Sequence, residues 1–236
     1  FSEETGKVNY EALRASQVYT AFKEMVAKLK IIDPGQFKSR AEKLAFWVNT
    51  YNTLVLDAVI ALNIRRSVAE KMGGISFFRN ARYEIGGLML SCDDIEHGIL
   101  RQNRGHPAFL TPQFKTSDPR LLWVIQPMDV RIHFAINCAS RSCPPVRVYT
   151  PQQLDQQLDR AARNFIASEI RIDHELRTMS ISRIFKWFAE DFGGQAGILR
   201  FIGQYMQDET DREWLRSTHE KIRIQYLDYD WRLNQA

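Results

Sequence analysis

The stretch that decides the fold is S-R-A-E-K-L-A-F-W-V-N-T-Y-N-T-L-V-L-D-A-V-I-A-L, residues 39–62. Its apolar side chains fall on most faces of a helix, so we expect one buried central helix over Ser39–Leu62. A buried helix must be covered by other elements. We therefore predict a helix-rich α+β fold in which this helix packs on a small antiparallel sheet.

The same stretch is too polar to suit a bilayer. Its apolar run is interrupted by five side chains that would be costly in hydrocarbon: Asn49, Thr50, Asn52, Thr53 and Asp57. We therefore expect no transmembrane segment.

The residues before the central helix form a separate helical segment, 1–38. Apolar residues recur there at roughly helical spacing, namely Tyr10, Leu13, Val18, Phe22, Val26 and Leu29. Asp33-Pro34-Gly35 ends the pattern. We expect residues 39–236 to be a single α+β domain, because a chain of 236 residues with 44% hydrophobic content can bury one sizeable core.

The charge pattern bears on the class of partner. The net charge is +4, but the basic residues are scattered among 28 acidic ones and form no long run. A nucleic-acid-binding protein is expected to have a basic face with aromatic stacking positions. We expect a small-molecule or peptide substrate or ligand, no nucleic acid and no cofactor, and the sequence leaves the oligomeric state open.

Short strands are predicted in two places. Residues 82–90 read as a hairpin around Gly86 and Gly87, which tolerate the backbone angles of a tight turn. Residues 121–125 and 130–137 alternate apolar and polar side chains and read as a second strand pair. Two later helices are expected over residues 151–166 and 184–191.

A helix is predicted to start after the hairpin. Ser91 is suited to cap it, and Asp94 follows three residues later. The helix carries Glu96 and His97. Two interpretations of His97 stay open: a catalytic group, or a partly exposed residue paired with one of its helical neighbours, Asp93 or Arg101.

Reactive side chains concentrate near the end of the strand predicted at 130–137. On that strand His133 and Asn137 share a face, which we expect to point toward a cleft rather than into the core. Cys138 follows where the strand gives way to a loop that also holds Cys143. A thiol, an imidazole and a carboxamide are the parts of a nucleophilic site.

The first functional hypothesis is a cysteine-dependent acyl-transfer hydrolase acting on an amide, peptide or thioester. Cys138 is the nucleophile, and His133 or His97 acts as its base. Amides of the loop 139–142 would stabilise an oxyanion. Three side chains are candidates for orienting the imidazole: Glu96, Asn137 and Asn52.

Two other hypotheses use the same residues. A Cys138–Cys143 disulfide would make the loop structural and the protein a non-catalytic ligand- or partner-binding module. The third is a zinc site built from Glu96, His97, His133 and a cysteine, although no ligand pair has a diagnostic spacing. The remaining cysteine, Cys92, is expected to be a small buried hydrophobe.

Four further residues are candidates for substrate binding. Asn49 and Asn52 share one face of the central helix, where they bind either backbone or substrate. Arg141 lies between the cysteines and either binds an anionic group or is solvated. Cys143 is the fourth. His106 lies in a polar context and is expected at the surface.

Five motifs in one order resemble the domain-of-unknown-function family numbered 547, from about the first helix to the C-terminus: A-F-W-V-N-T-Y-N at 45–52, Y-E-I-G-G at 83–87, D-D-I-E-H-G-I-L-R at 93–101, I-H-F-A-I-N-C-A-S-R-S-C-P-P at 132–145 and Y-D-W-R-L-N at 229–234. Because bacterial members are commonly exported, the resemblance implies a periplasmic or secreted location. No signal sequence is visible in this chain, which starts at Phe1.

The pattern also bears a weaker likeness to papain and transglutaminase folds. In those folds a buried helix packs on an antiparallel sheet that presents the catalytic histidine, and here the helix 41–62 and His133 could take those parts. The likeness departs at the nucleophile, because those enzymes place a cysteine at the start of the helix and this helix contains none.

Overall fold

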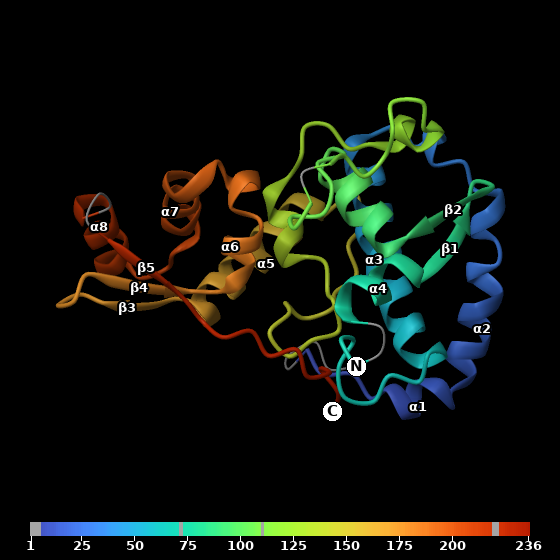
Figure 1. Ribbon diagram of the computed structural model, residues 1–236, viewed down its shortest axis with the longest axis horizontal. Coiled ribbons are helices and arrows are strands. Elements are labelled where there is room, and N and C mark those ends of the chain that lie inside the picture. The colour runs from blue at the N-terminus through green and yellow to red at the C-terminus, as the bar shows by residue number, and fades with distance from the viewer. Residues whose placement is uncertain (1–5, 71–72, 110, 219–221) are drawn as a thin grey trace. The chain divides into compact units, whose positions relative to one another are not determined.

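The structure is a computed structural model that describes residues 6–70, 73–109, 111–218 and 222–236. The chain forms two compact units. The first combines residues 1–154 with 230–236, and the second holds residues 155–229. Neither boundary coincides with residue 38, and a single domain over 39–236 stays a prediction. Helices and short strands make both units α+β, as predicted (Figure 1).

The first unit is built mainly from helices and one hairpin. Its α-helices and strands are α1 (Tyr10–Arg14), α2 (Gln17–Val26), α3 (Arg40–Ala61), α4 (Gly73–Asn80), β1 (Arg82–Ile85) and β2 (Leu88–Ser91). Short 3-10 turns span Leu29–Ile31, Pro34–Gln36, Pro119–Trp123 and Val130–Phe134, and a π-helix spans Asp94–Leu100.

Helix α3 is the buried central element, as the sequence predicts. It starts with a capping box, in which Ser39 Oγ accepts the amide of Glu42 and Glu42 Oε2 accepts the amide of Ser39. It is the one helix among the described residues long and apolar enough to cross a membrane, but 72% of its most apolar window is buried within the protein. Length and composition alone are weak evidence for a span, and a core helix meets the same test.

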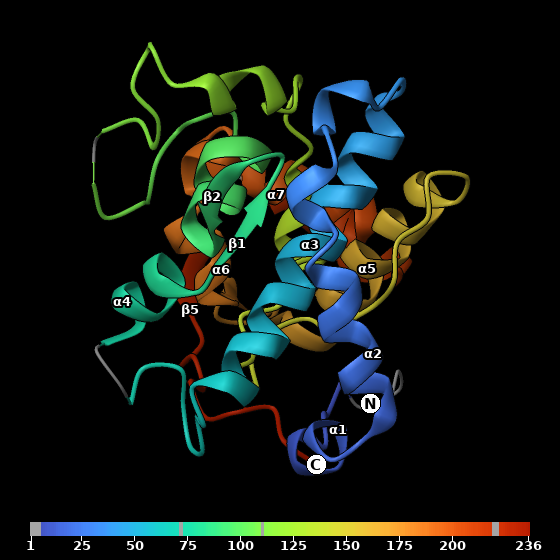
Figure 2. The same cartoon turned by 90° about the vertical axis from the view of Figure 1, so that its right-hand side faces the viewer.

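Helix α2 and the hairpin both lie against α3 (Figures 1 and 2). Asp57 of α3 is the point of attachment: its carboxylate accepts the hydroxyls of Tyr19 at 2.5 Å and Tyr83 at 2.9 Å, and Lys23 Nζ lies 3.1 Å away. The side chain of Asp57 is 6% exposed. These contacts satisfy a charge that would otherwise be costly to bury.

The N-terminal segment is helical, as predicted, but it is divided. Helix α1 ends at Arg14, and Ser16 caps α2 by accepting the amide of Tyr19 at 3.2 Å. Because the Ser16 side chain accepts a backbone amide that would otherwise bond within a continuous helix, the predicted apolar stripe is divided between α1 and α2.

The hairpin β1–β2 is confirmed, with Ile85 opposite Leu88 and with Gly86 and Gly87 both at positive φ. The second predicted strand pair is wrong. Residues Pro119–Trp123 and Val130–Phe134 are 3-10 helices. Each follows an aspartate whose side chain caps the backbone, since Asp118 accepts the amide of Arg120 and Asp129 accepts the amide of Arg131. These local bonds replace strand pairing.

The second unit places helices around a three-stranded sheet of order β3-β4-β5. Strand β4 is antiparallel to β3 and parallel to β5. The predicted helix at 151–166 is α5, and that at 184–191 is divided into α6 and a 3-10 turn that Gly193 ends at positive φ. The elements are α5 (Leu154–Glu169), β3 (Arg171–Asp173), β4 (Thr178–Ile181), α6 (Arg183–Trp187), α7 (Gly194–Tyr205), α8 (Glu209–Thr218) and β5 (Arg223–Tyr226).

Candidate functional site

The helix predicted after the hairpin is a π-helix over most of its length, Asp94–Leu100. Ser91 and Asp94 bond reciprocally, each side chain accepting the amide of the other residue. The amides of Arg101 and Asn103 then bond to carbonyls five residues back. A π-helix is uncommon and often marks a functional site.

Glu96 is buried in this helix and is held by the central helix. Its Oε2 accepts the hydroxyl of Tyr51 at 2.9 Å, and its Oε1 lies 3.8 Å from His97 Nδ1. Burial raises the pKa of Glu96 to about 7, although Arg101 and the Tyr51 hydroxyl oppose the shift. The charges of Asp93 and Cys143 raise that pKa further. A carboxyl group with a pKa near neutrality is suited to proton transfer.

His97 is buried rather than partly exposed, with 4% of its side chain accessible. The guanidinium of Arg101 donates to His97 Nδ1 at 3.0 Å and to the carbonyl of Gly105 at 2.7 Å. Because Nδ1 accepts a hydrogen bond, the ring proton is assigned to Nε2. The ring of His106 meets that of His97 edge to face at 5.0 Å. His106 is thus half-buried beside His97, where burial lowers the pKa of His106.

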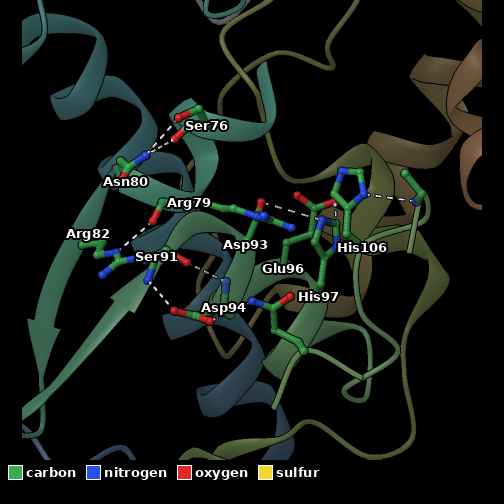
Figure 3. A network of polar contacts seen from close by, with 12 residues as sticks. Ser76, Arg79, Asn80, Arg82, Ser91, Asp93, Asp94, Glu96, His97 and His106 are labelled. Atoms are coloured by element: carbon green, nitrogen blue, oxygen red, sulfur yellow. Dashed lines mark hydrogen bonds and ion pairs between the residues drawn. The ribbon is translucent and has the colours of Figure 1, made fainter. Parts of the chain in front are cut away.

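Asp93 lies beside His97 and is almost as deeply buried, with 5% of its side chain exposed. Its Oδ2 makes no hydrogen bond and lies 3.5 Å from Arg79 Nε. Burial raises the pKa of Asp93 to about 6, against the opposing charge of Arg79. Figure 3 shows Arg79 reaching toward Asp93, with Glu96, His97 and His106 gathered next to it.

The two cysteines of the loop 138–143 are both thiols, and the described residues contain no disulfide. The backbone N–H of Cys138 donates to Cys143 Sγ at 3.0 Å. Cys138 Sγ is a donor instead, since it bonds to Ser140 Oγ at 3.3 Å. In these two bonds one sulfur atom accepts and the other donates.

A family model matches residues 35–166, which is more than half of the chain. The chain belongs to DUF547. The description of this family is a protein of unknown function. The DUF547 match confirms the resemblance seen in the sequence, but it ends before the motif at 229–234. No curated protein and no solved structure matches the chain, and the likeness to papain and transglutaminase folds is not supported.

The matched DUF547 region holds both the π-helix and the loop 138–143, and the two are electrostatically connected. Cys143 is among the charges that raise the pKa of Glu96, and Cys138 among those that raise the pKa of Tyr51. Glu96, His97, Cys138 and Cys143, which the sequence analysis singled out, therefore belong to one region of the first unit.

The predicted carboxamides of this DUF547 chain are bonded to backbone. Asn52 donates to the carbonyl of Ala135 at 2.9 Å and accepts the amide of Asn137 at 2.8 Å. Asn49 makes the same pair of bonds with Tyr149. Asn137 bonds to the carbonyl of Pro144 and the amide of Ala139. Asn52 and Asn137 thus hold the loop 138–143, called here the thiol loop, while Asn49 holds the backbone of Tyr149.

The amides expected to form an oxyanion hole are largely in use. The amide of Ala139 bonds to Asn137, and those of Arg141 and Ser142 bond to the carbonyls of Arg232 and Asp230. Residues 230–236 therefore brace the loop. The exposed Arg141 lies near Asp230, whose pKa is held to about 2, mainly by Arg232 and to a lesser extent by Arg141.

The structure also decides the predictions for His133, the zinc site and Cys92. His133 is 3% exposed on a 3-10 helix, so it is not a cleft residue on a strand. Within the described part of the chain, no three His, Cys, Asp or Glu side chains are placed to hold a metal ion, so the zinc set of Glu96, His97, His133 and a cysteine is not assembled. Cys92 is fully buried, as predicted.

Three residues that contact Asp93, Glu96 or His97 were not predicted from the sequence to lie at the site: Tyr51, Arg79 and His106. Tyr51 lies in the quoted motif at 45–52, but nothing in that motif indicates a partner 45 residues away. The spacing of Asp93, His97 and Arg101 did indicate one shared helical face. Arg79 and His106 come from other segments, and only the fold brings them there.

Proposed function

We propose that this protein catalyses cysteine-dependent acyl transfer, with Cys143 rather than Cys138 as the nucleophile. The observation that carries the proposal is the hydrogen bond from the Cys138 amide to Cys143 Sγ at 3.0 Å. A donor aimed at sulfur favours the thiolate, which is the nucleophilic form of cysteine. Cys138 Sγ instead donates to Ser140 Oγ.

Glu96 is the proton acceptor in this proposal. Its pKa of about 7 lets it take a proton from Cys143 and return one later, and its charge is coupled to that of Cys143. His97 is less suited to be the base, because its Nδ1 already accepts a hydrogen bond from Arg101. Tyr51 holds the carboxylate in position.

The steps balance as an ordinary acyl transfer. The Cys143 thiolate attacks the acyl carbon, a thioester bond forms, and the bond to the leaving oxygen, nitrogen or sulfur breaks. Glu96 returns the proton to the leaving group. Water then attacks the thioester, the carbon–sulfur bond breaks, the acyl group leaves as a carboxylic acid, and the thiol of Cys143 is regenerated. The expected substrates are small amides, peptides or thioesters.

The test is the formation of an acyl-enzyme. The reduced protein is mixed with p-nitrophenyl acetate, and the acetylated residue is mapped by mass spectrometry. We expect a burst of p-nitrophenolate and an acetyl group on Cys143, in the native protein and in Cys138→Ala. Cys143→Ala should show no burst, and Glu96→Gln should slow it.

The two cysteine variants are a matched pair, because both thiols lie in one loop and both are partly exposed. Acetylation of Cys138 in preference to Cys143 would overturn the assignment. An absence of any acyl-enzyme, with both thiols accessible to iodoacetamide, would favour the non-catalytic binding module. The periplasmic or secreted location is likewise a proposal and is tested by fractionating cells that express the full-length protein.

A further inference from the structure

We propose that Asp93 is the binding site for a primary ammonium group of the substrate, which makes aminoacyl compounds the preferred acyl donors. This inference rests on the proposed function for its acyl-transfer part. The binding of an ammonium group to Asp93 can be measured without any turnover.

The first argument is the state of the Asp93 carboxylate. Its side chain is 5% exposed, and its Oδ2 makes no hydrogen bond. Its Oδ1 is 3.8 Å from His97 Nε2, which is beyond hydrogen-bond distance. Buried carboxylates are ordinarily paired and hydrogen-bonded. A cationic ligand with N–H donors would supply the close hydrogen bonds that Arg79, at 3.5 Å, does not make with Oδ2.

The second argument is that the cation now nearest to Asp93 is weakly held. Arg79 Nε lies 3.5 Å from Oδ2, and the Arg79 side chain is 51% exposed. Its guanidinium also lies over the ring of Phe109, at 5.1 Å from the centroid. Arg79 can therefore move away from Asp93 and keep both solvent and its aromatic contact. A compact ammonium group, with three donors, can take its place.

The other groups around Asp93 do not compete as cations. His97 Nδ1 accepts a hydrogen bond from Arg101, and the guanidinium of Arg101 is directed to His97 and to the carbonyl of Gly105. Burial and the charges of Arg79 and Arg101 lower the pKa of His106, which disfavours its charged form. The neighbouring Asp94 raises the pKa of Asp93, although Asp94 is itself paired with Arg120 at 3.0 Å.

The position of Asp93 relative to Glu96 indicates a short spacer. The two residues are three positions apart on one helical segment, and the charge of Asp93 contributes to the raised pKa of Glu96. An ammonium group on Asp93 would leave the acyl carbon of an α-amino compound close to Glu96 and its coupled thiol. We therefore expect an α-ammonium group rather than the end of a lysine side chain.

The experiment compares isosteric ligands on the whole protein at pH 7, where Asp93 is ionised. Glycinamide and propanamide differ in having an ammonium or a methyl group, and their binding is titrated by chemical-shift changes in NMR spectra. We expect glycinamide to bind about tenfold more tightly, as one charge-assisted hydrogen bond would give. Asp93→Asn should remove the preference.

Arg79 supplies a variant with the opposite sign. Arg79→Gln removes the competing cation and should strengthen glycinamide binding several-fold. Arg82→Gln, which removes an exposed positive charge nearby, should have little effect. Equal binding of the two ligands, a preference that survives in Asp93→Asn, or weaker binding in Arg79→Gln would each overturn the proposal.

A second pair, 6-aminohexanamide and heptanamide, distinguishes the source of the ammonium group. A preference seen only in this pair would retain the Asp93 site but assign it to a lysine side chain, which overturns the α-amino part. The p-nitrophenyl esters of glycine and propionic acid then test catalysis separately. Asp93-dependent binding without a burst would overturn the acyl-transfer function alone, and a burst without binding preference would overturn the ammonium site alone.

Discussion

Tyr51 donates its hydroxyl to Glu96 Oε2 at 2.9 Å, which joins the central helix to the π-helix across 45 positions of sequence. Tyr51 is 2% exposed and Glu96 is 9% exposed, so water competes little with this bond. It stabilises the charged form of Glu96 and holds the pKa of that carboxyl near 7 instead of higher. The central helix thereby sets the protonation of the candidate site.

Tyr51→Phe should raise the pKa of Glu96 further, because the carboxylate loses a donor while it remains buried. We expect the pH at which alkylation of Cys143 by iodoacetamide is half-maximal to rise by about one unit. The profile is measured by quantifying alkylated peptides between pH 5 and 9. A profile that is unchanged, or that moves to lower pH, would contradict the coupling between Tyr51, Glu96 and the thiol.

Glu96 should also make the protein less stable as the pH rises. Its pKa is raised from 4.5 to about 7 in the folded state, so between these values the folded protein holds a proton that the unfolded chain has released. The stabilisation is complete below the unfolded pKa and is lost as the pH rises through about 7. The loss is on the order of 3 kcal/mol.

Urea unfolding at a series of pH values measures this effect. Glu96→Gln should remove most of the decline between pH 4.5 and 7, and the remaining decline is assigned to Asp93, whose pKa is raised from 3.8 to about 6. If the free energy of unfolding of Glu96→Gln falls with pH as steeply as that of the native protein, the raised pKa of Glu96 is not the cause of the decline.

Asn52→Ala should lower the free energy of unfolding by roughly 2–4 kcal/mol, because it leaves a buried amide and a buried carbonyl without partners. Those two groups belong to Asn137 and Ala135, next to the thiol loop. Asn80→Ala is the control, since Asn80 is exposed and bonds only within α4. Equal losses in the two variants would show that the Asn52 bonds contribute no more than a surface contact.

Asp57→Ala should cost more than most single substitutions, roughly 3–5 kcal/mol, because the buried hydroxyl of Tyr83, the partly buried hydroxyl of Tyr19 and the ammonium of Lys23 lose their shared acceptor. The measurement is the midpoint of urea unfolding. Glu24→Ala, an exposed acid on α2, is the control and should change stability by less than about 0.5 kcal/mol. A small effect of Asp57→Ala would mean that α2 and the hairpin are held to α3 by apolar contacts alone.

The parts of the fold that could be predicted are those that local sequence determines. The capping box at Ser39 and Glu42, the paired glycines at 86 and 87 and the Ser91–Asp94 cap each specify one backbone arrangement. The predicted strands failed for a related reason. Their alternation suggested extended chain, but the aspartates at 118 and 129 capped 3-10 turns with their own side chains.

The candidate site was only partly predictable, because its decisive contacts join distant segments. Glu96 and the cysteines were found from their chemistry, but the choice between the two sulfur atoms depends on which of them an amide faces. His106 read as a surface residue, since its loop carries no sign that it returns to His97. The sequence indicates a buried carboxamide at Asn52 and a cleft residue at Asn137. It does not indicate that the backbone amide of Asn137 donates to the side chain of Asn52.

The segment that braces the loop 138–143 is synthesised after the whole second unit. Asp230 and Ser142 bond to each other across 88 positions, and the whole second unit, residues 155–229, lies between them in the sequence. On the ribosome, that unit has emerged completely before its flanking brace becomes available, so the loop must wait for a long-range closure. A nascent chain halted before Asp230 would therefore present both thiols without this brace, and the candidate site would mature only after the second unit has been synthesised.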